Sequence, residues 1–116
     1  MSIKNVLDMD NKKDLTMTME KKENVSVDKS FKVNFSKELD ELTVNISNVY
    51  VLDDKNNKVD VEVSYDKKNK AVEVKSKNNY ESGKKYILFI KGIQSVIKDG
   101  KVVKLVAPIK MEFTVK

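Results

Sequence analysis

The 116-residue sequence contains no cysteine, histidine, tryptophan or arginine, and these absences exclude several classes of function. Without cysteine the chain has neither a reactive thiolate nor a thiolate metal site. Without histidine it lacks the commonest general base and the commonest metal ligand. Its three glycines are too few to build a glycine-rich loop around a phosphate. We therefore expect a protein that is not an enzyme and that needs no cofactor.

Charge and hydrophobicity exclude two further kinds of partner. All 23 basic residues are lysines, they are interleaved with 18 acidic residues, and the net charge is +5. The guanidinium group that reads guanine edges and clamps phosphates is missing, so we expect a solvated mixed-charge surface and no nucleic-acid partner. No apolar run approaches the roughly 20 residues that cross a membrane, so we expect no membrane insertion.

Apolar and polar residues alternate with a period of two along most of the chain, as in strands with one buried and one solvated face. The apolar sets are Leu15, Met17, Met19; Phe31, Val33, Phe35; Val49, Val51; Val59, Val61, Val63, Tyr65; Val72, Val74; and Met111, Phe113, Val115. The segment YILFI, residues 86–90, is apolar throughout and predicts the central and most buried strand. Because polar Asx-rich turns separate these segments, the pattern predicts an all-β antiparallel sandwich of about seven strands.

Two connections depart from the strand pattern. Ser36 is placed to cap a short helical turn that runs through Leu42. Ile93, Val96 and Ile97 have the spacing of a single amphipathic turn. We expect a helical turn at each place.

Length and periodicity together predict one domain. Residues 1–13 show no periodicity and are expected to be a leader or an inter-domain linker. Residues 14–116 are expected to form the sandwich.

Short motifs in a fixed order add a family resemblance. The segment FKVNFSKELD, residues 31–40, is similar to the "V-x-F-S-x-x-L/M-D" signature of bacterial Ig-like domains of the S-layer (SbsA-like, Big_5) type. NVYVLD follows at residues 48–53, a Tyr-x-x-Gly-x-x-Tyr corner at 80–86, KDG at 98–100 and FTV at 113–115. The resemblance implies an immunoglobulin-like sandwich in a secreted bacterial surface protein, with no catalytic residues to transfer.

The residues that we expect to matter most are architectural. Gly83 is expected to supply the positive φ of the corner, Tyr80 to close the end of the sandwich, and the Tyr86 hydroxyl to bond a nearby backbone group. The predicted structural set is Phe31, Val33, Phe35, Gly83, Tyr86, Leu88, Phe113 and Val115.

Two candidate ligand sites are weaker. Asp53, Asp54, Asn56 and Asp60 offer the hard oxygen ligands that Ca²⁺ prefers, although their spacing lacks the glycine and distal glutamate of an EF-hand. Tyr50 alternates away from its valine neighbours and is predicted to face either the other sheet or solvent. One ring alone is a poor platform for a sugar.

The sequence therefore supports two functional hypotheses. The first is a non-catalytic spacer or interaction module of an exported bacterial cell-surface protein, in contact with neighbouring domains of a longer chain and located outside the cell. The second is a ligand-binding module for cell-wall polymer, an acidic glycan or calcium. Under either hypothesis, another surface protein is a candidate partner.

Overall fold

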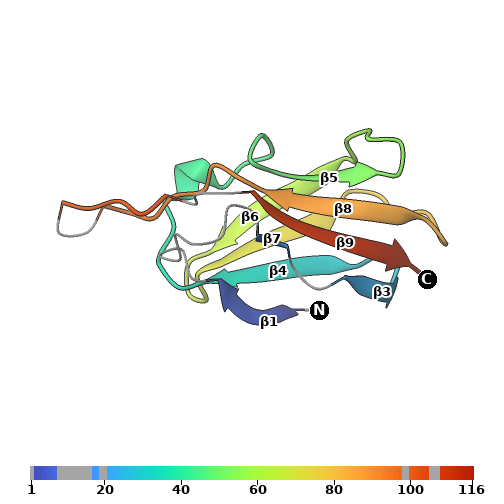
Figure 1. Ribbon diagram of the computed structural model, residues 1–116, viewed down its shortest axis with the longest axis horizontal. Coiled ribbons are helices and arrows are strands. Elements are labelled where there is room, and N and C mark those ends of the chain that lie inside the picture. Colours follow the sequence, from blue (N-terminus) through green and yellow to red (C-terminus); the bar gives the residue numbers. More distant parts are fainter. Residues whose placement is uncertain (1, 8–16, 19–20, 98–99, 105–107) are drawn as a thin grey trace.

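A computed structural model of the chain describes residues 2–7, 17–18, 21–97, 100–104 and 108–116. The strands are β1 (Ser2–Leu7), β2 (Met17–Thr18), β3 (Lys22–Val25), β4 (Ser30–Phe35), β5 (Val49–Asp53), β6 (Val61–Asp66), β7 (Ala71–Ser76), β8 (Lys85–Ile90) and β9 (Ile109–Val115). One 3-10 turn, η1 (Glu41–Thr43), lies between β4 and β5. Figure 1 shows the strands running along the length of the molecule.

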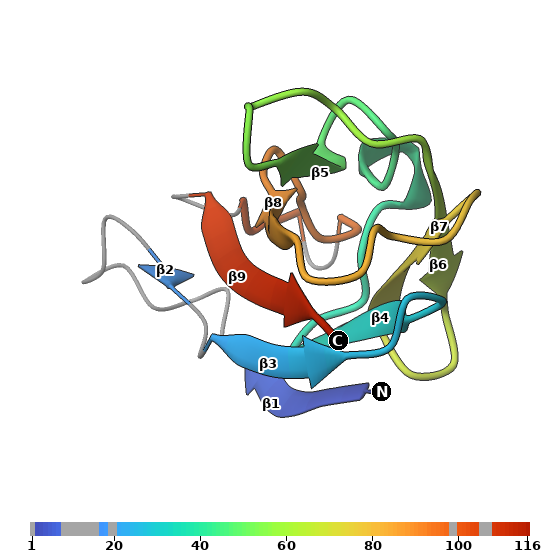
Figure 2. The same ribbon diagram turned by 90° about the vertical axis from the view of Figure 1, so that its right-hand side faces the viewer.

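The strands form two layers, which Figure 2 shows nearly end-on. One sheet has the order β1-β4-β7-β6, and the other has the order β2-β9-β8-β5 with β3 also paired to β9. This arrangement confirms the all-β sandwich. The pairings among β4 to β9 are antiparallel, but β1 pairs with β4, and β2 and β3 pair with β9, in parallel. The antiparallel pattern therefore holds for the body of the sandwich and not for its N-terminal strands.

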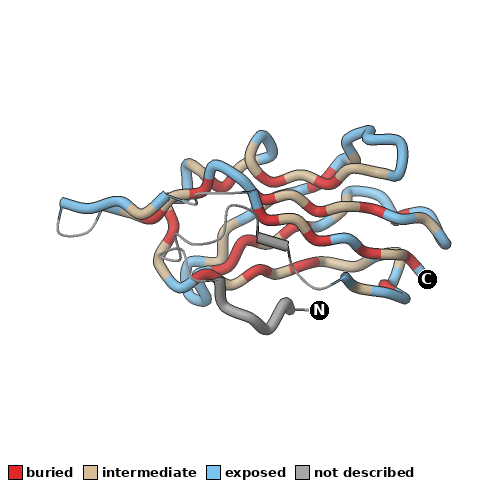
Figure 3. The backbone as a smooth tube through the Cα atoms, viewed as in Figure 1, coloured by how far each residue is buried: buried red, intermediate tan, exposed pale blue. Residues whose placement is uncertain are grey.

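The core lies between the sheets and follows the period-two pattern. On β4 the odd-numbered residues are buried and the even-numbered ones are half-buried, and β9 repeats this alternation. Figure 3 shows the same alternation of buried and less buried positions along the strands. Within the core Phe31, Tyr80, Tyr86 and Phe113 pack ring against ring, with the Phe113 centroid 4.8 Å from that of Phe31 and 5.2 Å from that of Tyr80. Aromatic packing of this kind adds stability beyond the area that it buries.

The strand β8 is central, as predicted, but it is not uniformly buried. It lies between β9 and β5, and only Tyr86, Leu88 and Ile90 face the core. Ile87 and Phe89 are half-buried on the outer face of the sheet. An unbroken apolar run does not reveal which face is covered, and here two apolar side chains remain on the wet side.

The prediction missed two strands. β3 buries only Val25, so it carries too few apolar residues for a period-two signal. β1 lies inside the segment predicted to be a leader or linker, and Ile3 on it is paired with Val33 of β4. The boundary between residues 13 and 14 stays a prediction. The expected strand around Leu15 and Met19 falls mostly outside the described residues.

Neither predicted helical turn forms as expected. The turn after β4 is η1, and its cap is Asp40, whose carboxylate accepts a hydrogen bond from the Leu42 amide, and not Ser36. Leu42 points to solvent, with 87% of its surface exposed, whereas Leu39 is buried. Leu39 forms a backbone β-bridge with Ser95, which lies in the connection between β8 and β9. This bridge holds the segment around Leu39 extended, although the spacing of its leucines favours a helical turn.

The connection after β8 is also extended. Gln94 bridges to Lys104, and the Ser95 hydroxyl accepts a hydrogen bond of 2.9 Å from the Val103 amide. We call the connection between β8 and β9 the arm. Ile93 is buried at the base of the arm, and Ile97 is exposed further out. The arm projects from one end of the sandwich (Figure 1).

Candidate binding surfaces

The Tyr-x-x-Gly-x-x-Tyr corner lies in the connection from β7 of one sheet to β8 of the other. The Tyr86 hydroxyl accepts a 2.9 Å hydrogen bond from the Glu81 amide. Gly83 has a φ of 77°, in the left-handed region, and its amide donates to the Val115 carbonyl at 3.0 Å. The hydroxyl–backbone contact and the positive φ are what the motif predicted.

Tyr80 closes the end of the core, but its hydroxyl differs from that of Tyr86. The ring is buried and lies 4.9 Å from the Tyr86 ring. Its hydroxyl is buried and has no hydrogen-bond partner among the described residues. The pKa of Tyr80 is raised to about 12, mainly because the hydroxyl is buried and to a smaller extent because Tyr86 lies beside it. A buried hydroxyl without a partner costs free energy.

Removing the hydroxyl group from each of the two tyrosines should therefore change the stability of the fold differently. Tyr86→Phe leaves the Glu81 amide without its partner and should lower the free energy of unfolding by about 1 kcal/mol. Tyr80→Phe removes a polar group that has no partner and should leave stability unchanged or raise it. Urea unfolding of both variants against the parent chain checks this. A larger loss in Tyr80→Phe than in Tyr86→Phe would contradict the assignment of the corner hydroxyl.

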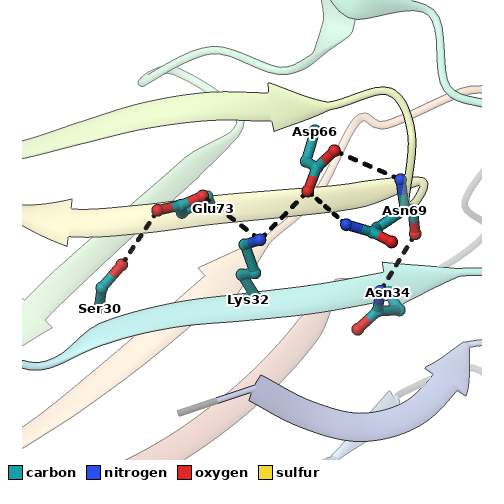
Figure 4. A network of polar contacts seen from close by, with 6 residues as sticks. All are labelled: Ser30, Lys32, Asn34, Asp66, Asn69 and Glu73. Carbon is teal, nitrogen blue, oxygen red and sulfur yellow. Dashed lines mark hydrogen bonds and ion pairs between the residues drawn. The ribbon is translucent and has the colours of Figure 1, made fainter.

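The outer face of the four-stranded sheet carries a polar network, drawn in Figure 4. Lys32 on β4 reaches Asp66 at 3.1 Å and Glu73 at 4.0 Å. The Asn69 side-chain amide donates to the Asp66 carboxylate at 2.7 Å. These contacts lower the pKa of Asp66 to about 2. The hydrogen bond from Asn69 has the largest effect, and that from Lys32 the next largest. The network ties the β6–β7 hairpin to β4.

The low pKa of Asp66 predicts an acid-dependent stability. Because the folded pKa of about 2 lies below the ordinary value of 3.8, this carboxylate stabilises the fold above about pH 4. The stabilisation is lost as the pH falls towards 2. Asp66→Asn should show a shallower decline in stability between pH 4 and pH 2 than the parent chain. Urea midpoints measured at half-unit pH steps check this, and identical slopes would contradict it.

The four residues proposed for calcium lie around the β5–β6 connection, where Asp53 is already used by the backbone. Its carboxylate accepts 2.9 Å hydrogen bonds from the Lys55 and Asn57 amides, and these lower the pKa of the carboxyl, that from Asn57 most. Asn56 occupies the left-handed region at φ 63°, as expected for an Asx residue in a turn.

A half-open cleft of about 370 Å³ adjoins this turn, and Asp53, Asp54 and Asp60 are among its lining residues, while Asn56 is not. Even so, the described residues contain no group of three carboxylates that could hold a metal ion. The local geometry of Asp53 is thus accounted for by the turn. Calcium binding stays a prediction for which these contacts supply no support.

The outer face of the five-stranded sheet carries a row of aromatic rings and lysines. Tyr50 on β5 and Phe89 on β8 are register partners, and their rings stack with centroids 5.3 Å apart. The Lys58 and Lys91 ammonium groups lie 4.8 Å and 5.6 Å from the centroid of Tyr50. That of Lys110 on β9 lies 5.9 Å from the centroid of Phe89. We call these five residues the lysine–aromatic row.

Only one member of this row, Tyr50, is a candidate from the sequence alone, which leaves its ring open between the other sheet and solvent. Phe89 lies in the segment predicted to be the most buried strand. The three lysines carry no distinguishing signal, because the sequence contains 23 lysines spread along its length. The informative signal was the apolar outward position of Phe89, which becomes readable only once its register with Tyr50 is known.

The predicted structural residues differ in their exposure to solvent. Seven of the eight are buried between the two sheets, and Gly83 lies exposed at the corner. The buried members are Phe31, Val33, Phe35, Tyr86, Leu88, Phe113 and Val115. These seven side chains form part of the core, and their contribution to stability stays a prediction.

Comparison with known proteins decides the family. The bacterial Ig-like domain family matches residues 13–115, nearly the whole chain. The chain belongs to this family. The match and the two-layer sandwich agree with the resemblance seen in the motifs. No catalytic family is indicated.

Solved structures similar to this bacterial Ig-like domain come from S-layer proteins. The N-terminal part of the bacterial S-layer protein SbsC matches with a TM-score of 0.61 and 23% identity, over 88% of this chain and 24% of that one. Domains 1–6 of surface layer protein SbsC match with a TM-score of 0.60 and 22% identity, over 86% of this chain and 14% of that one. At this identity the likeness concerns the fold.

The Ig-like domain spans less than a quarter of each of these longer chains. No curated protein matches it. Within the described residues the structure has no helix long and apolar enough to cross a membrane.

Proposed function

We propose that this Ig-like domain is a non-catalytic spacer module of an exported bacterial cell-surface protein, with neighbouring domains on the same chain. The observation that carries the proposal is the match to the bacterial Ig-like family together with the small share of the longer S-layer chains that the domain covers. Its place of action is then the cell surface, outside the membrane.

The strand arrangement suits a module that bears tension along its length. β3 and β9 run parallel, with Lys22 opposite Phe113 and Val25 opposite Val115. The Lys116 amide also donates to the Val25 carbonyl at 2.8 Å. Pulling upstream of β3 and downstream of β9 moves paired strands in opposite directions along their axes. Their hydrogen bonds are then loaded together instead of one after another.

One end of the sandwich offers surface for a neighbouring domain. Ile97 and Val102 are exposed on the projecting arm. Leu42 and Ile46 are exposed on the β4–β5 connection, which reaches the arm through the Leu39–Ser95 bridge. A contiguous apolar patch is typical of a surface that packs against another domain, and these side chains supply apolar surface to this end of the sandwich.

Single-molecule pulling tests the mechanical part of the proposal. The natural sequence has no cysteine, so paired cysteines give defined attachment points. Lys21→Cys with Lys116→Cys pulls β3 against β9 in shear, whereas Ser82→Cys with Lys116→Cys peels β9 from β8. We expect a clearly higher unfolding force in the first geometry. Equal forces would count against a load-bearing spacer.

Location is tested separately. Antibodies against the isolated domain should label intact cells of the source bacterium as strongly as permeabilised ones. Labelling that requires permeabilisation would contradict a place at the cell surface.

A second candidate function is ligand binding, with cell-wall polymer, an acidic glycan or calcium as the ligand. The lysine–aromatic row favours an anionic ligand, since it gathers three ammonium groups on one face. Another surface protein is a further possible partner within this hypothesis.

A further inference from the structure

Three members of the lysine–aromatic row lie in one register row across β5, β8 and β9, while Lys58 and Lys91 come from the connections that follow β5 and β8. Tyr50 lies opposite Phe89, and Phe89 lies opposite Lys110. The two rings stack on each other, Lys58 lies over Tyr50, and Lys110 lies over Phe89. The arrangement differs from that of solvated lysines because three ammonium groups have aromatic neighbours at defined distances.

The core does not account for this row. Tyr50 and Phe89 face away from the buried cluster and stay half-exposed. In the next register row Leu52 lies opposite Ile87, and both are half-exposed as well. The face therefore carries four adjacent apolar side chains that the described structure leaves partly open to solvent.

The lysines of the row are available to a ligand. None of Lys58, Lys91 and Lys110 forms an ion pair with a carboxylate in the described part of the chain. The alternation of the strands places Lys85 and Glu112 on the same face, and Glu112 is the one acidic side chain on β8 or β9 that faces this way. The excess of positive charge calls for an anionic occupant.

The rings hold the cations in place. An ammonium group is attracted to the face of an aromatic ring, and this attraction restricts a lysine side chain that would otherwise be free. Because the ring faces are covered by each other and by lysines, they are not free to stack on a neutral sugar. Recognition must then come from charge, supported by the apolar surface of Leu52 and Ile87.

We propose that the lysine–aromatic row binds an acidic polysaccharide. Carboxylates of the polymer meet the ammonium groups, and the C–H faces of its sugar rings lie against the half-exposed side chains of Leu52 and Ile87. A charged polymer without sugar rings can pair with the ammonium groups but cannot pack against the apolar side chains. This binding role goes beyond the spacer function and does not depend on it.

Calorimetric titration of the intact chain with three polymers tests the proposal. Polygalacturonate should bind, with an affinity that falls as salt rises, because exposed charges are screened. Dextran, which is neutral, should not bind. Polyphosphate, which has charge without sugar rings, should bind at least tenfold more weakly than polygalacturonate. No binding of polygalacturonate, or equal binding of polyphosphate, would overturn the proposal.

Charge-matched variants locate the site. The triple change Lys58→Gln, Lys91→Gln and Lys110→Gln should weaken polygalacturonate binding at least tenfold. The control Lys67→Gln, Lys68→Gln and Lys77→Gln removes the same charge from exposed positions outside this face and should change the affinity less than threefold. Equal losses in the two variants would show general attraction and would overturn the site.

The rings are tested with the charge kept constant. Tyr50→Leu with Phe89→Leu retains every lysine but removes the groups that position them. We expect at least a threefold loss of affinity for polygalacturonate in a variant whose urea midpoint shows that it is folded. An unchanged affinity in that folded variant would show that the rings play no part.

Discussion

Phe113→Ala is expected to lower the free energy of unfolding by about 3–5 kcal/mol, the usual range for truncating a fully buried phenylalanine. Phe113 is wholly buried on β9 and its ring contacts those of Phe31, Tyr80 and Tyr86. The substitution leaves a cavity among three aromatic side chains that strands of both sheets and the corner hold in position. Such rings move little to fill it.

Urea or thermal unfolding followed by circular dichroism measures this loss. Since domains are stable by only about 5–15 kcal/mol, the variant should be close to its unfolding threshold. Phe89→Ala is the matched control, because it removes an identical side chain from the half-exposed outer face. Its effect should be clearly smaller. Equal effects would mean that Phe113 is not at the centre of the core.

Gly83→Val is expected to cost about 2 kcal/mol, because an L-residue in the left-handed region brings its Cβ too close to the backbone and β-branching adds to the clash. A Cβ at this position would meet no other part of the described molecule within 4 Å. The cost therefore comes from the φ of 77° and not from crowding. A fall in the melting temperature of roughly 10 °C should accompany it.

Gly83→Asn separates conformation from size, because asparagine tolerates the left-handed region better than other residues. It should retain most of the stability that valine loses. Differential scanning calorimetry of the two variants decides the matter. A valine variant as stable as the parent chain would refute the conformational role of Gly83.

These two residues also show how far local sequence can predict structure. Phe113 lies in an alternating segment, and the period of two places its side chain on the buried face without knowledge of the partner strands. Gly83 lies in a short motif whose spacing requires a tight corner between two tyrosines. Both predictions concern a strand or a turn, within which a few neighbouring residues determine the geometry.

The failures concern residues whose state depends on distant partners. Phe89 belongs to the segment that the sequence predicts to be the most buried strand, yet its side chain lies half-buried on the outer face of the sheet. Ser36 has the chemistry of a helix cap, but the β4–β5 connection is drawn towards Ser95 of another segment, and the cap falls at Asp40. Val25 alone is buried on β3, so that strand depends on pairing with β9 rather than on its own pattern.

The lysine–aromatic row has the same dependence on tertiary structure. Tyr50 and Lys110 lie sixty residues apart in sequence and meet the same ring only because β5 and β9 both pair with β8. The sequence by itself determined the all-β class, the buried face of most strands, the corner at Gly83 and the absence of thiol and imidazole chemistry. Only the tertiary structure decided which outward side chains lie together, because strand order and register are set by packing of the whole sandwich and are not encoded in any one segment.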